Sequence, residues 1–374
     1  MAMAAAWPAT RTFFLAATNN PNFFNGLGEP NYTLAGTPVS AGGCTYTINP
    51  GGRAFSASGG NGSIAITAGA GCNWTAASTA SWITITGGSS GTGNGNVTCQ
   101  VVANSGAAQS APINITAATG NLSFTVEEGA ASIAAYTNKG SMAHLAVAGS
   151  WTTIYTLANT GSAAAQMRLS FFDSNGNPLA LPLTFPQSPN GVGALLASTL
   201  DRTINPGAEL IIQSTGVVSA PITVGSAQLL TNGSISGFAR FSTAFAASIQ
   251  DAVVPLETRN ASGYVVPYEN TNGSATGIAL ANITAQPVPV TINYRIGGSA
   301  GYSGDGVLDN TETLVVPPMG HMSFNLADRL KDTAGEVGTV EFLTPSAGQI
   351  SLLGLLFNST GAFSTLPALV KSGN

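Results

Sequence analysis

The chain has 374 residues, of which 7% are charged and 44% are hydrophobic, and its formal net charge at pH 7 is −5. An average soluble protein carries about 25% charged residues, so polarity here rests on hydroxyl and amide side chains, which favour turns and strand faces over helix interiors. The hydrophobic content excludes a disordered chain. The 11 scattered basic residues argue against a nucleic-acid partner, and the absence of a long apolar run predicts no membrane span.

The segment of residues 1–43 differs from the rest of the chain. Its apolar stretches are short and interrupted, so no signal peptide is recognisable in it. We predict either that this arm folds back on its own chain or that it supplies a strand to the open sheet edge of a neighbouring copy. The aromatic residues that would join subunits in the second case are Trp7, Phe13, Phe14, Phe23 and Phe24.

Residues 44–130 consist of short alternating strands separated by glycine-rich turns such as "GGSSGTGNGN", which predicts a β-sandwich. In "CNWTA", Cys72 and Trp74 share one strand face, and an inward Trp beside a cysteine is typical of an immunoglobulin-like core. Cys44 opens the first strand and is the natural partner of Cys72, and their bridge would contribute about 3 to 5 kcal/mol. Cys99 is left over, either as a small buried residue or as an exposed thiol that couples two chains.

The second tryptophan of this region, Trp82, lies in "SWITIT", where Ile83 and Ile85 take one strand face and the tryptophan takes the other. If the isoleucines belong to the core, Trp82 is the candidate for a glycan-stacking ring. The alternative is that Trp82 packs across one end of the sandwich.

These residues together resemble a BACON domain, a bacterial immunoglobulin-like module that often accompanies carbohydrate-active domains. The resemblance covers about residues 44–127 and rests on the Gly-Cys-x-Trp-x-Ala step, on Ser-Trp-Ile, on the "GTGNGN" turn and on the closing "VVANSGAAQS" strand. It implies an immunoglobulin-like sandwich with a carbohydrate-binding or mucin-binding role. The chain departs from the family pattern at Cys99, where the family usually has an aromatic or polar residue, and we expect no glycoside hydrolase or peptidase domain after the module.

Two later segments, 140–250 and 260–374, are similar to each other and predict a tandem pair of β-sandwiches. They resemble uncharacterised tandem β-sandwich repeats of secreted bacterial proteins. The matched positions are Asn159 with Asn282, Gly207 with Gly320, and Ser236 with Ser351.

The sequence contains no recognisable catalytic motif. Its two histidines, His144 and His321, lie in different segments without a second ligand at metal spacing, and we expect both at the surface or at strand ends. Two loops carry the hard oxygen ligands that calcium prefers. The first, with Asp173, Asn175 and Asn177, is more simply a hairpin turn, and the second contains Asp305, Asp309, Asn310 and Glu312.

The sequence thus predicts an all-β protein of three immunoglobulin-like sandwiches in tandem, preceded by an extended arm. We expect a non-enzymatic, extracellular or cell-surface (bacterial) structural or adhesive protein without a cofactor other than calcium, which self-associates or binds other surface proteins. The alternative is a protein that binds a polysaccharide or mucin glycan through the BACON-like module.

Overall fold

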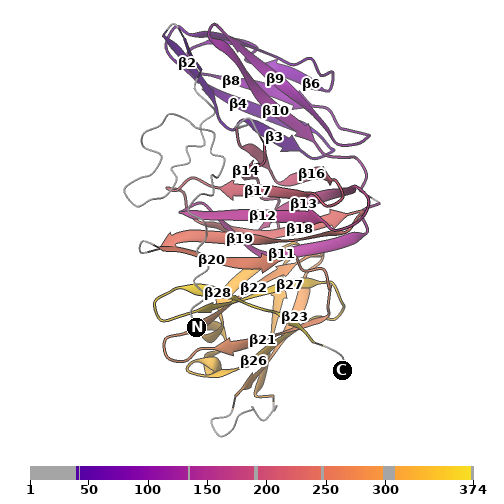
Figure 1. Ribbon diagram of the computed structural model, residues 1–374, viewed down its shortest axis with the longest axis vertical. Coiled ribbons are helices and arrows are strands. Elements are labelled where there is room, and N and C mark those ends of the chain that lie inside the picture. Colours follow the sequence, from indigo (N-terminus) through magenta and orange to yellow (C-terminus); the bar gives the residue numbers. More distant parts are fainter. Residues whose placement is uncertain are drawn as a thin grey trace, which may run out of the picture.

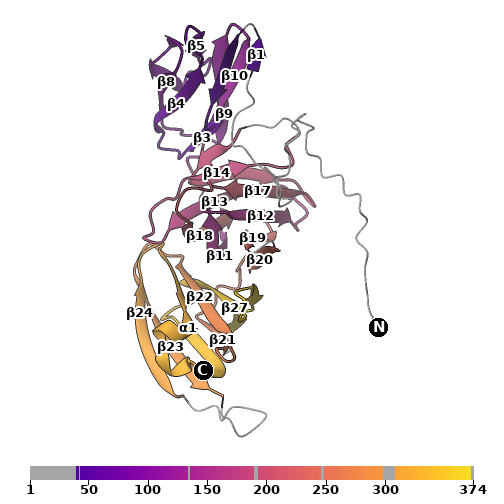
Figure 2. The same ribbon diagram turned by 90° about the vertical axis from the view of Figure 1, so that its left-hand side faces the viewer.

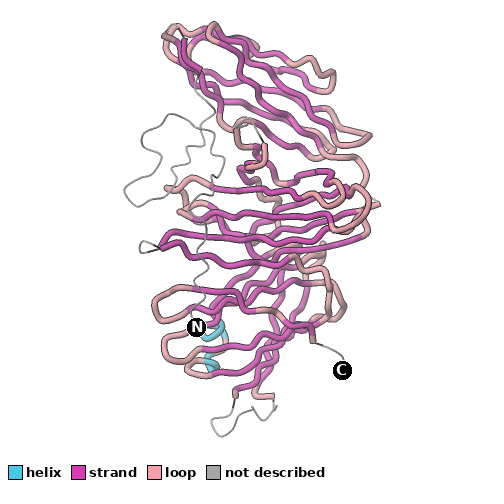
Figure 3. The backbone as a smooth tube through the Cα atoms, viewed as in Figure 1, coloured by secondary structure: helices cyan, strands magenta, loops and turns pink. Residues whose placement is uncertain are grey.

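The computed structural model describes residues 39–41, 43–133, 135–188, 193–245, 248–297 and 308–371. The predicted all-β class is confirmed: strands dominate these ranges (Figure 3), beside one short helix, α1 (Leu326–Arg329), and one 3-10 turn, η1 (Lys331–Thr333). Among the described residues no helix has the length and apolarity that a membrane span requires. The strands fall into three groups stacked along the long axis of the molecule (Figure 1), which we call the first, second and third units.

The first unit is a sandwich of two sheets, one with the order β1-β2-β4-β8-β6 and the other with the order β3-β10-β9-β5-β7. Side chains alternate between buried and exposed along its strands, as in β4, because successive residues point to opposite sheet faces. The strands are β1 (Val39–Ala41), β2 (Cys44–Ile48), β3 (Gly52–Phe55), β4 (Gly60–Ala68), β5 (Asn73–Ala77), β6 (Ile83–Gly87), β7 (Ser90–Thr92), β8 (Gly95–Val101), β9 (Gln109–Ala117) and β10 (Gly120–Glu128).

The second unit contains the sheet β11-β18-β13-β16 and the strand order β20-β19-β12-β17-β14-β15. A buried cluster that includes Tyr155, Leu169 and Phe171 fills the space between these layers. The strands are β11 (Asn138–Val147), β12 (Trp151–Asn159), β13 (Ala165–Asp173), β14 (Leu181–Thr184), β15 (Leu195–Ala197), β16 (Thr199–Ile204), β17 (Glu209–Thr215), β18 (Thr223–Thr231), β19 (Ile235–Phe245) and β20 (Ser248–Pro255).

The third unit repeats this arrangement in the sheets β24-β23-β26-β21-β29 and β25-β22-β27-β28. In sheet order, β21-β26-β23-β24 corresponds to β11-β18-β13-β16, and β28-β27-β22-β25 corresponds to β20-β19-β12-β17. The strands are β21 (Gly263–Glu269), β22 (Ala275–Asn282), β23 (Val288–Ile296), β24 (Asn310–Val316), β25 (His321–Asn325), β26 (Val337–Leu343), β27 (Ile350–Phe357), β28 (Phe363–Leu366) and β29 (Leu369–Val370).

Asn159 and Asn282 occupy corresponding positions in the two repeats and make corresponding side-chain hydrogen bonds. Both are buried, and each amide Nδ2 donates at 2.7 Å to the carbonyl four residues later, which belongs to Ala163 in one repeat and to Gln286 in the other. Each amide also donates to the last carbonyl of a strand in the opposite sheet, as Asn159 does to Ile204 at 2.8 Å and Asn282 does to Val316 at 3.1 Å. Because a buried amide must be satisfied in this way, the asparagine marks the duplication in the sequence.

The structure corrects one of the sequence matches between the repeats by one residue. Asn159 N donates to Ala208 O and Asn282 N donates to Gly320 O, so Gly320 corresponds to Ala208. The partner of Gly207 is then Met319, and both have positive φ, +69° and +54°. The turn requires a left-handed residue, which glycine adopts without steric cost, and the sequence match aligned the glycines instead of the turns.

The first and second units share a continuous sheet. The end of β10 pairs in parallel with β3, and β3 pairs in parallel with β15 of the second unit. The sheet β3-β10-β9-β5-β7 is therefore one end of an eleven-stranded sheet that continues through β15 to β20 among the described residues. Gly51 and Gly193 lie at this joint, where a Cβ on Gly51 would come within 2.6 Å of Gly193 Cα.

The second and third units are joined through buried strands. Burial is continuous along residues 140–147 of β11, 276–282 of β22 and 350–355 of β27. A strand that packs on one side only alternates between buried and exposed, so these strands are covered on both faces, by their own core and by the adjacent unit. Leu353 and Leu355 of the third unit accordingly join the hydrophobic cluster of the second.

The three units form an elongated molecule whose long axis runs through both joints (Figure 2). A further contact ties the edge strand β20 to β28: Thr365 Oγ1 accepts from Val253 N at 2.9 Å and donates to Val253 O at 2.7 Å. A backbone hydrogen bond also crosses this joint, from His321 N to Ser174 O at 3.2 Å, so both joints contain backbone hydrogen bonds.

Candidate functional site

The first tryptophan of the BACON-like unit is a core residue. Trp74 is 3% exposed, and its Nε1 donates to Gly93 O at 2.8 Å. A Cβ at Gly91 or at Gly95 would come within 2.2 Å or 2.3 Å of the indole ring. Gly91 and Gly95 of the "GTGNGN" turn are therefore required because the chain at these two positions lies against the ring.

Cys44 and Cys72 form a disulfide with a sequence separation of 28 residues. Cys99 is a free cysteine, 1% exposed, and burial raises the pKa of its thiol. A buried thiol of raised pKa is a poor nucleophile, so in the folded chain Cys99 is a core residue and not an exposed thiol.

Removal of the disulfide by Cys44→Ser with Cys72→Ser is expected to lower the free energy of unfolding by about 3.5 kcal/mol, because closing a loop of this length restricts the unfolded chain. Chemical denaturation of the variant and the parent measures this. Cys99→Ser is the matched control for loss of one thiol, and it should leave the disulfide intact. Equal midpoints for the double variant and the parent would contradict the expectation.

Trp82 is half-buried and packs against the core of the first unit. Ile83 is buried, as expected, while Ile85 is partly exposed. Trp82 therefore offers only part of its ring to solvent.

The residues predicted to bind calcium are engaged by protein donors where they are described. Asp309 Oδ2 accepts from Ile296 N at 2.6 Å, and Glu312 forms an ion pair with Arg329. Asp173 Oδ1 accepts from the backbone N atoms of Asn175 and Asn177, at 2.9 and 2.8 Å.

In the first loop, the hydrogen bonds of Asp173 Oδ1 to the backbone of Asn175 and Asn177 hold a hairpin turn, which is the alternative to calcium binding given above. In the second loop, Asn310 begins strand β24, and Asp305 lies outside the described residues. Within the described ranges, no group of three His, Cys, Asp or Glu side chains is arranged to hold a metal. The five aromatic residues proposed to join subunits, Trp7, Phe13, Phe14, Phe23 and Phe24, also lie outside the described residues.

The two histidines were expected at the surface or at strand ends; neither lies at the surface, although His321 does begin a strand. His144 on β11 and His321 at the start of β25 are 8% and 2% exposed, and His144 Nδ1 lies 3.0 Å from His321 Nε2 across the joint between the second and third units. The surface expectation was wrong because each histidine was considered within its own segment, and docking of the units buries both.

An aromatic cluster surrounds this histidine pair. The ring of Phe241 lies 5.1 Å from that of His144, 5.7 Å from that of Trp151 and 5.8 Å from that of Phe363, measured between centroids. Phe363 belongs to the third unit and the other three residues to the second. Rings at such separations stabilise each other beyond simple burial, so the cluster strengthens the joint.

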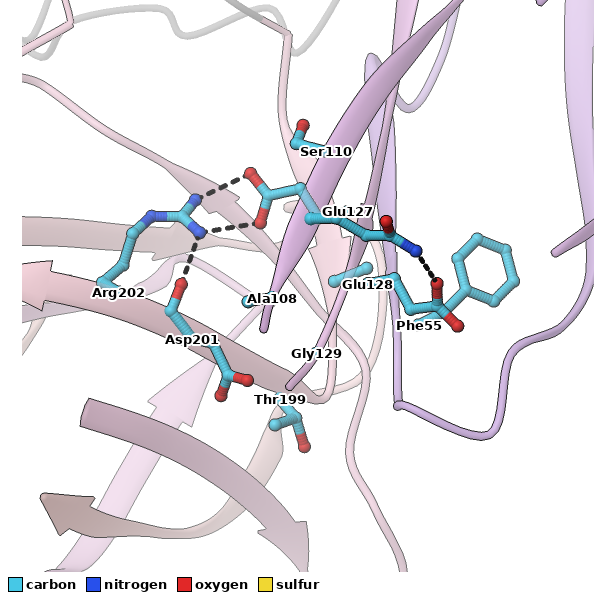
Figure 4. A pocket seen from close by; sticks show the side chains of 11 residues that line it. Phe55, Ala108, Ser110, Glu127, Glu128, Gly129, Thr199, Asp201 and Arg202 are labelled. Carbon is cyan, nitrogen blue, oxygen red and sulfur yellow. Dashed lines mark hydrogen bonds and ion pairs between the residues drawn. The ribbon is translucent and has the colours of Figure 1, made fainter. Parts of the chain in front are cut away.

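Charged side chains gather where the first unit meets the second (Figure 4). Arg202 on β16 donates from Nη1 and Nη2 to both carboxylate oxygens of Glu127 on β10, at 2.8 Å each. On β13 and β16, Arg168 binds both oxygens of Asp201, at 2.7 and 2.6 Å. Asp201 Oδ2 also accepts from Ala130 N at 2.8 Å. Bidentate ion pairs are stronger and more directional than single contacts. The bidentate pair of Arg202 with Glu127 crosses the joint.

This charged site was missed by the sequence reading, because Arg202 and Glu127 are 75 residues apart in the chain. The sequence feature that could have indicated this site is the scarcity of charged residues in the chain. In a protein with 7% charged residues, the adjacent pairs Glu127–Glu128 and Asp201–Arg202 at strand ends stand out.

Comparison with solved structures found distant similarities. A Bacteroides ovatus GH5 xyloglucanase in complex with a XXXG heptasaccharide is 22% identical over 25% of this chain and 20% of its own, with a TM-score of 0.21. The surface layer protein SbsC, domains 4–9, is 10% identical over 90% of this chain and 66% of its own, with a TM-score of 0.20. The I-band fragment I67–I69 from titin is 9% identical over 91% of this chain and 100% of its own, with a TM-score of 0.16.

A search of curated proteins found no match. A family comparison matched the first unit, whose core, turns and disulfide are described above. Residues 45–127 match the model of the viral BACON domain, which confirms the resemblance indicated by the motifs around Trp74 and Trp82.

Proposed function

We propose that this chain is a non-enzymatic structural element of an extracellular or cell-surface assembly, in which it acts as a stiff spacer of three units. The observation that carries the proposal is the construction of the two joints. One joint is a continuous β-sheet through β3 and β15, and the other buries strands on both faces. Joints of this kind restrict the relative movement of units that short linkers alone would leave free.

The electrostatics of the chain support the same function. A net charge of −5 over 374 residues gives little repulsion between copies. This favours assembly, either with itself or with other surface proteins.

A scattering experiment tests the proposal. In small-angle X-ray scattering, the full chain should behave as a rigid rod with one maximum dimension. Gly51→Val should broaden the distribution of interatomic distances, because a Cβ there meets Gly193 backbone at 2.6 Å. Gly106→Val is the matched control beside the same joint, since its nearest neighbour, Asn104 Oδ1, is 3.6 Å away.

The outcomes separate clearly. A parent chain that scatters as flexibly linked beads would overturn the spacer function. A concentration series in the same experiment reports assembly, because the forward scattering per unit mass rises when copies associate. Constant forward scattering would restrict the proposal to assembly with other proteins.

The second candidate is glycan binding by the BACON-like unit, and the observation that favours it is the partly exposed ring of Trp82. Loss of binding to a glycan array in Trp82→Ala would support it. Unchanged binding in that variant would move the site elsewhere.

A further inference from the structure

The two repeats dock on each other through different surfaces. The third unit contributes one face of its sheet, formed by β22 and β27, and the second unit contributes an end, formed by its edge strands β11 and β20 (Figure 2). Leu353 and Leu355 lie on this face of β27 and are buried in the hydrophobic cluster of the second unit. Because the repeats correspond strand by strand, each surface of this joint has a counterpart in the other repeat.

The first counterpart is the outer face of β12, β19 and β20 in the second unit, which we call the sheet face. In the registers of the two sheets, Phe238 on β19 occupies the position that Leu353 occupies on β27. Phe238 is 39% exposed, and Val253 and Ile249, on the same side of the adjacent strand β20, are 40% and 68% exposed. A surface that is buried in the third unit is therefore open in the second.

The second counterpart is the end of the third unit formed by β21 and β29, which we call the terminal edge. Val265 occupies in β21 the position that Ser141 occupies in β11. Leu369 of β29 pairs with Val265 on the free side of β21, as Glu257 pairs with β11. Leu369 and Val370 are 53% and 38% exposed. The edge that receives a sheet face in the second unit is thus open in the third.

The sheet face is more polar than its buried counterpart. Arg240 lies at the position of Leu355. It forms an ion pair with Asp251, which lies at the position of Phe363. Surfaces that meet only after each chain has folded are about as polar as the rest of the exposed surface, whereas permanently buried ones are more apolar. This composition suits a contact between copies that is made and broken in water.

We propose that the terminal edge of one copy docks on the sheet face of a second copy, so that the contact between copies repeats the joint between the second and third units. The occupant is a second copy because this chain carries both surfaces, and their counterparts already fit together within it. The inference rests on the self-assembly named in the proposed function. Because the two surfaces differ, the contact is heterologous, and each added copy leaves one surface of each kind free for the next.

Sedimentation velocity of the full chain over a concentration series tests this contact. The parent should form species larger than a dimer as the concentration rises. Phe238→Glu places a charge on the sheet face and Leu369→Glu places one on the terminal edge. Each variant alone should stay monomeric, because every contact between its copies includes the altered surface. Val102→Glu in the first unit is the matched control, since Val102 is as exposed as Leu369, and it should assemble like the parent.

A mixture of the two variants distinguishes a heterologous contact from any other. Phe238→Glu keeps the terminal edge intact and Leu369→Glu keeps the sheet face intact. Equal amounts should therefore form a dimer with one copy of each variant, and nothing larger, because the two surfaces left over in that dimer are the altered ones. Ile249→Lys and Val370→Lys are the second changes at the two surfaces, to be used if circular dichroism shows that a first variant is unfolded.

Three results would overturn the inference: a parent that stays monomeric at every concentration, association that persists in either single variant, or a mixture that stays monomeric. Failure of this contact is distinguishable from failure of the spacer function. A parent that is monomeric but scatters as a rigid rod would remove only the contact between copies, whereas flexibly linked units would remove the spacer.

Discussion

Acidification from pH 7 to pH 4 is expected to destabilise the chain by several kcal/mol through the histidine pair at the joint between the second and third units. Burial lowers the pKa of His144 to about 4. Burial, and then the charge of its neighbour, lowers the pKa of His321 to about 3. In the unfolded chain both titrate near 6.5, so below that pH the unfolded state binds more protons than the folded state.

This difference in pKa sets the direction of the stability change and the pH range in which it occurs. Above about pH 6.5 both states are neutral and the contribution to stability is constant. As the pH falls from 6.5 towards 4, each histidine lowers the free energy of unfolding by about 1.4 kcal/mol per pH unit. The ring of Phe241 and Ser174 Oγ, 3.4 Å from His321 Nδ1, contact the pair, and neither can neutralise a buried imidazolium.

Urea unfolding between pH 7 and pH 5 measures the effect, in a range where most carboxylates stay ionised. The double variant His144→Gln with His321→Gln keeps a polar pair that does not titrate. The parent should lose stability more steeply than this variant as the pH falls. Parallel pH profiles for the two proteins would show that the pair is not the titrating element.

Truncation of Phe241 is expected to cause a second large loss of stability. The side chain is 2% exposed and contacts rings on both sides of the joint, so Phe241→Ala leaves a cavity where two units meet and should cost about 3 to 5 kcal/mol. Because the lost contacts include Phe363 of the third unit, we also expect the second and third units to unfold in separate steps.

A matched control lies on the same strand. Phe238 is 39% exposed and lies on the opposite face of β19, so Phe238→Ala removes the same group without leaving a buried cavity. Its cost should stay within about 0.5 kcal/mol, as for other surface changes. Denaturation followed by tryptophan fluorescence and by circular dichroism compares the variants, and similar losses for both would contradict a role of Phe241 in the joint.

The two joints differ in the side chains that they bring together. The joint between the first and second units carries the ion pair of Arg202 with Glu127, whereas the joint between the second and third units carries the histidine pair and the aromatic cluster. A failure of glycan binding would leave the stiffness of the molecule untouched. A flexible molecule, in contrast, would remove the basis for a spacer.

The sequence by itself determined the features that depend on neighbouring residues. The period-two alternation around Cys72 and Trp74 identified the strand face that enters the core, because that face is set by the backbone pleat. The turn glycines Gly91 and Gly95 carried the family pattern, since they lie against the Trp74 ring. Asn159 and Asn282 revealed the duplication because each satisfies a local set of carbonyls, the same in both repeats.

Only the tertiary structure decided how the units meet. The contact of His144 with His321 and the pair of Arg202 with Glu127 join residues far apart in the chain, and no local pattern specifies them. The match of Gly207 to Met319 was hidden for the same kind of reason, because a turn conserves its backbone angle and not its side chain. Contacts between units depend on the docking of surfaces that are complete only after each unit has folded.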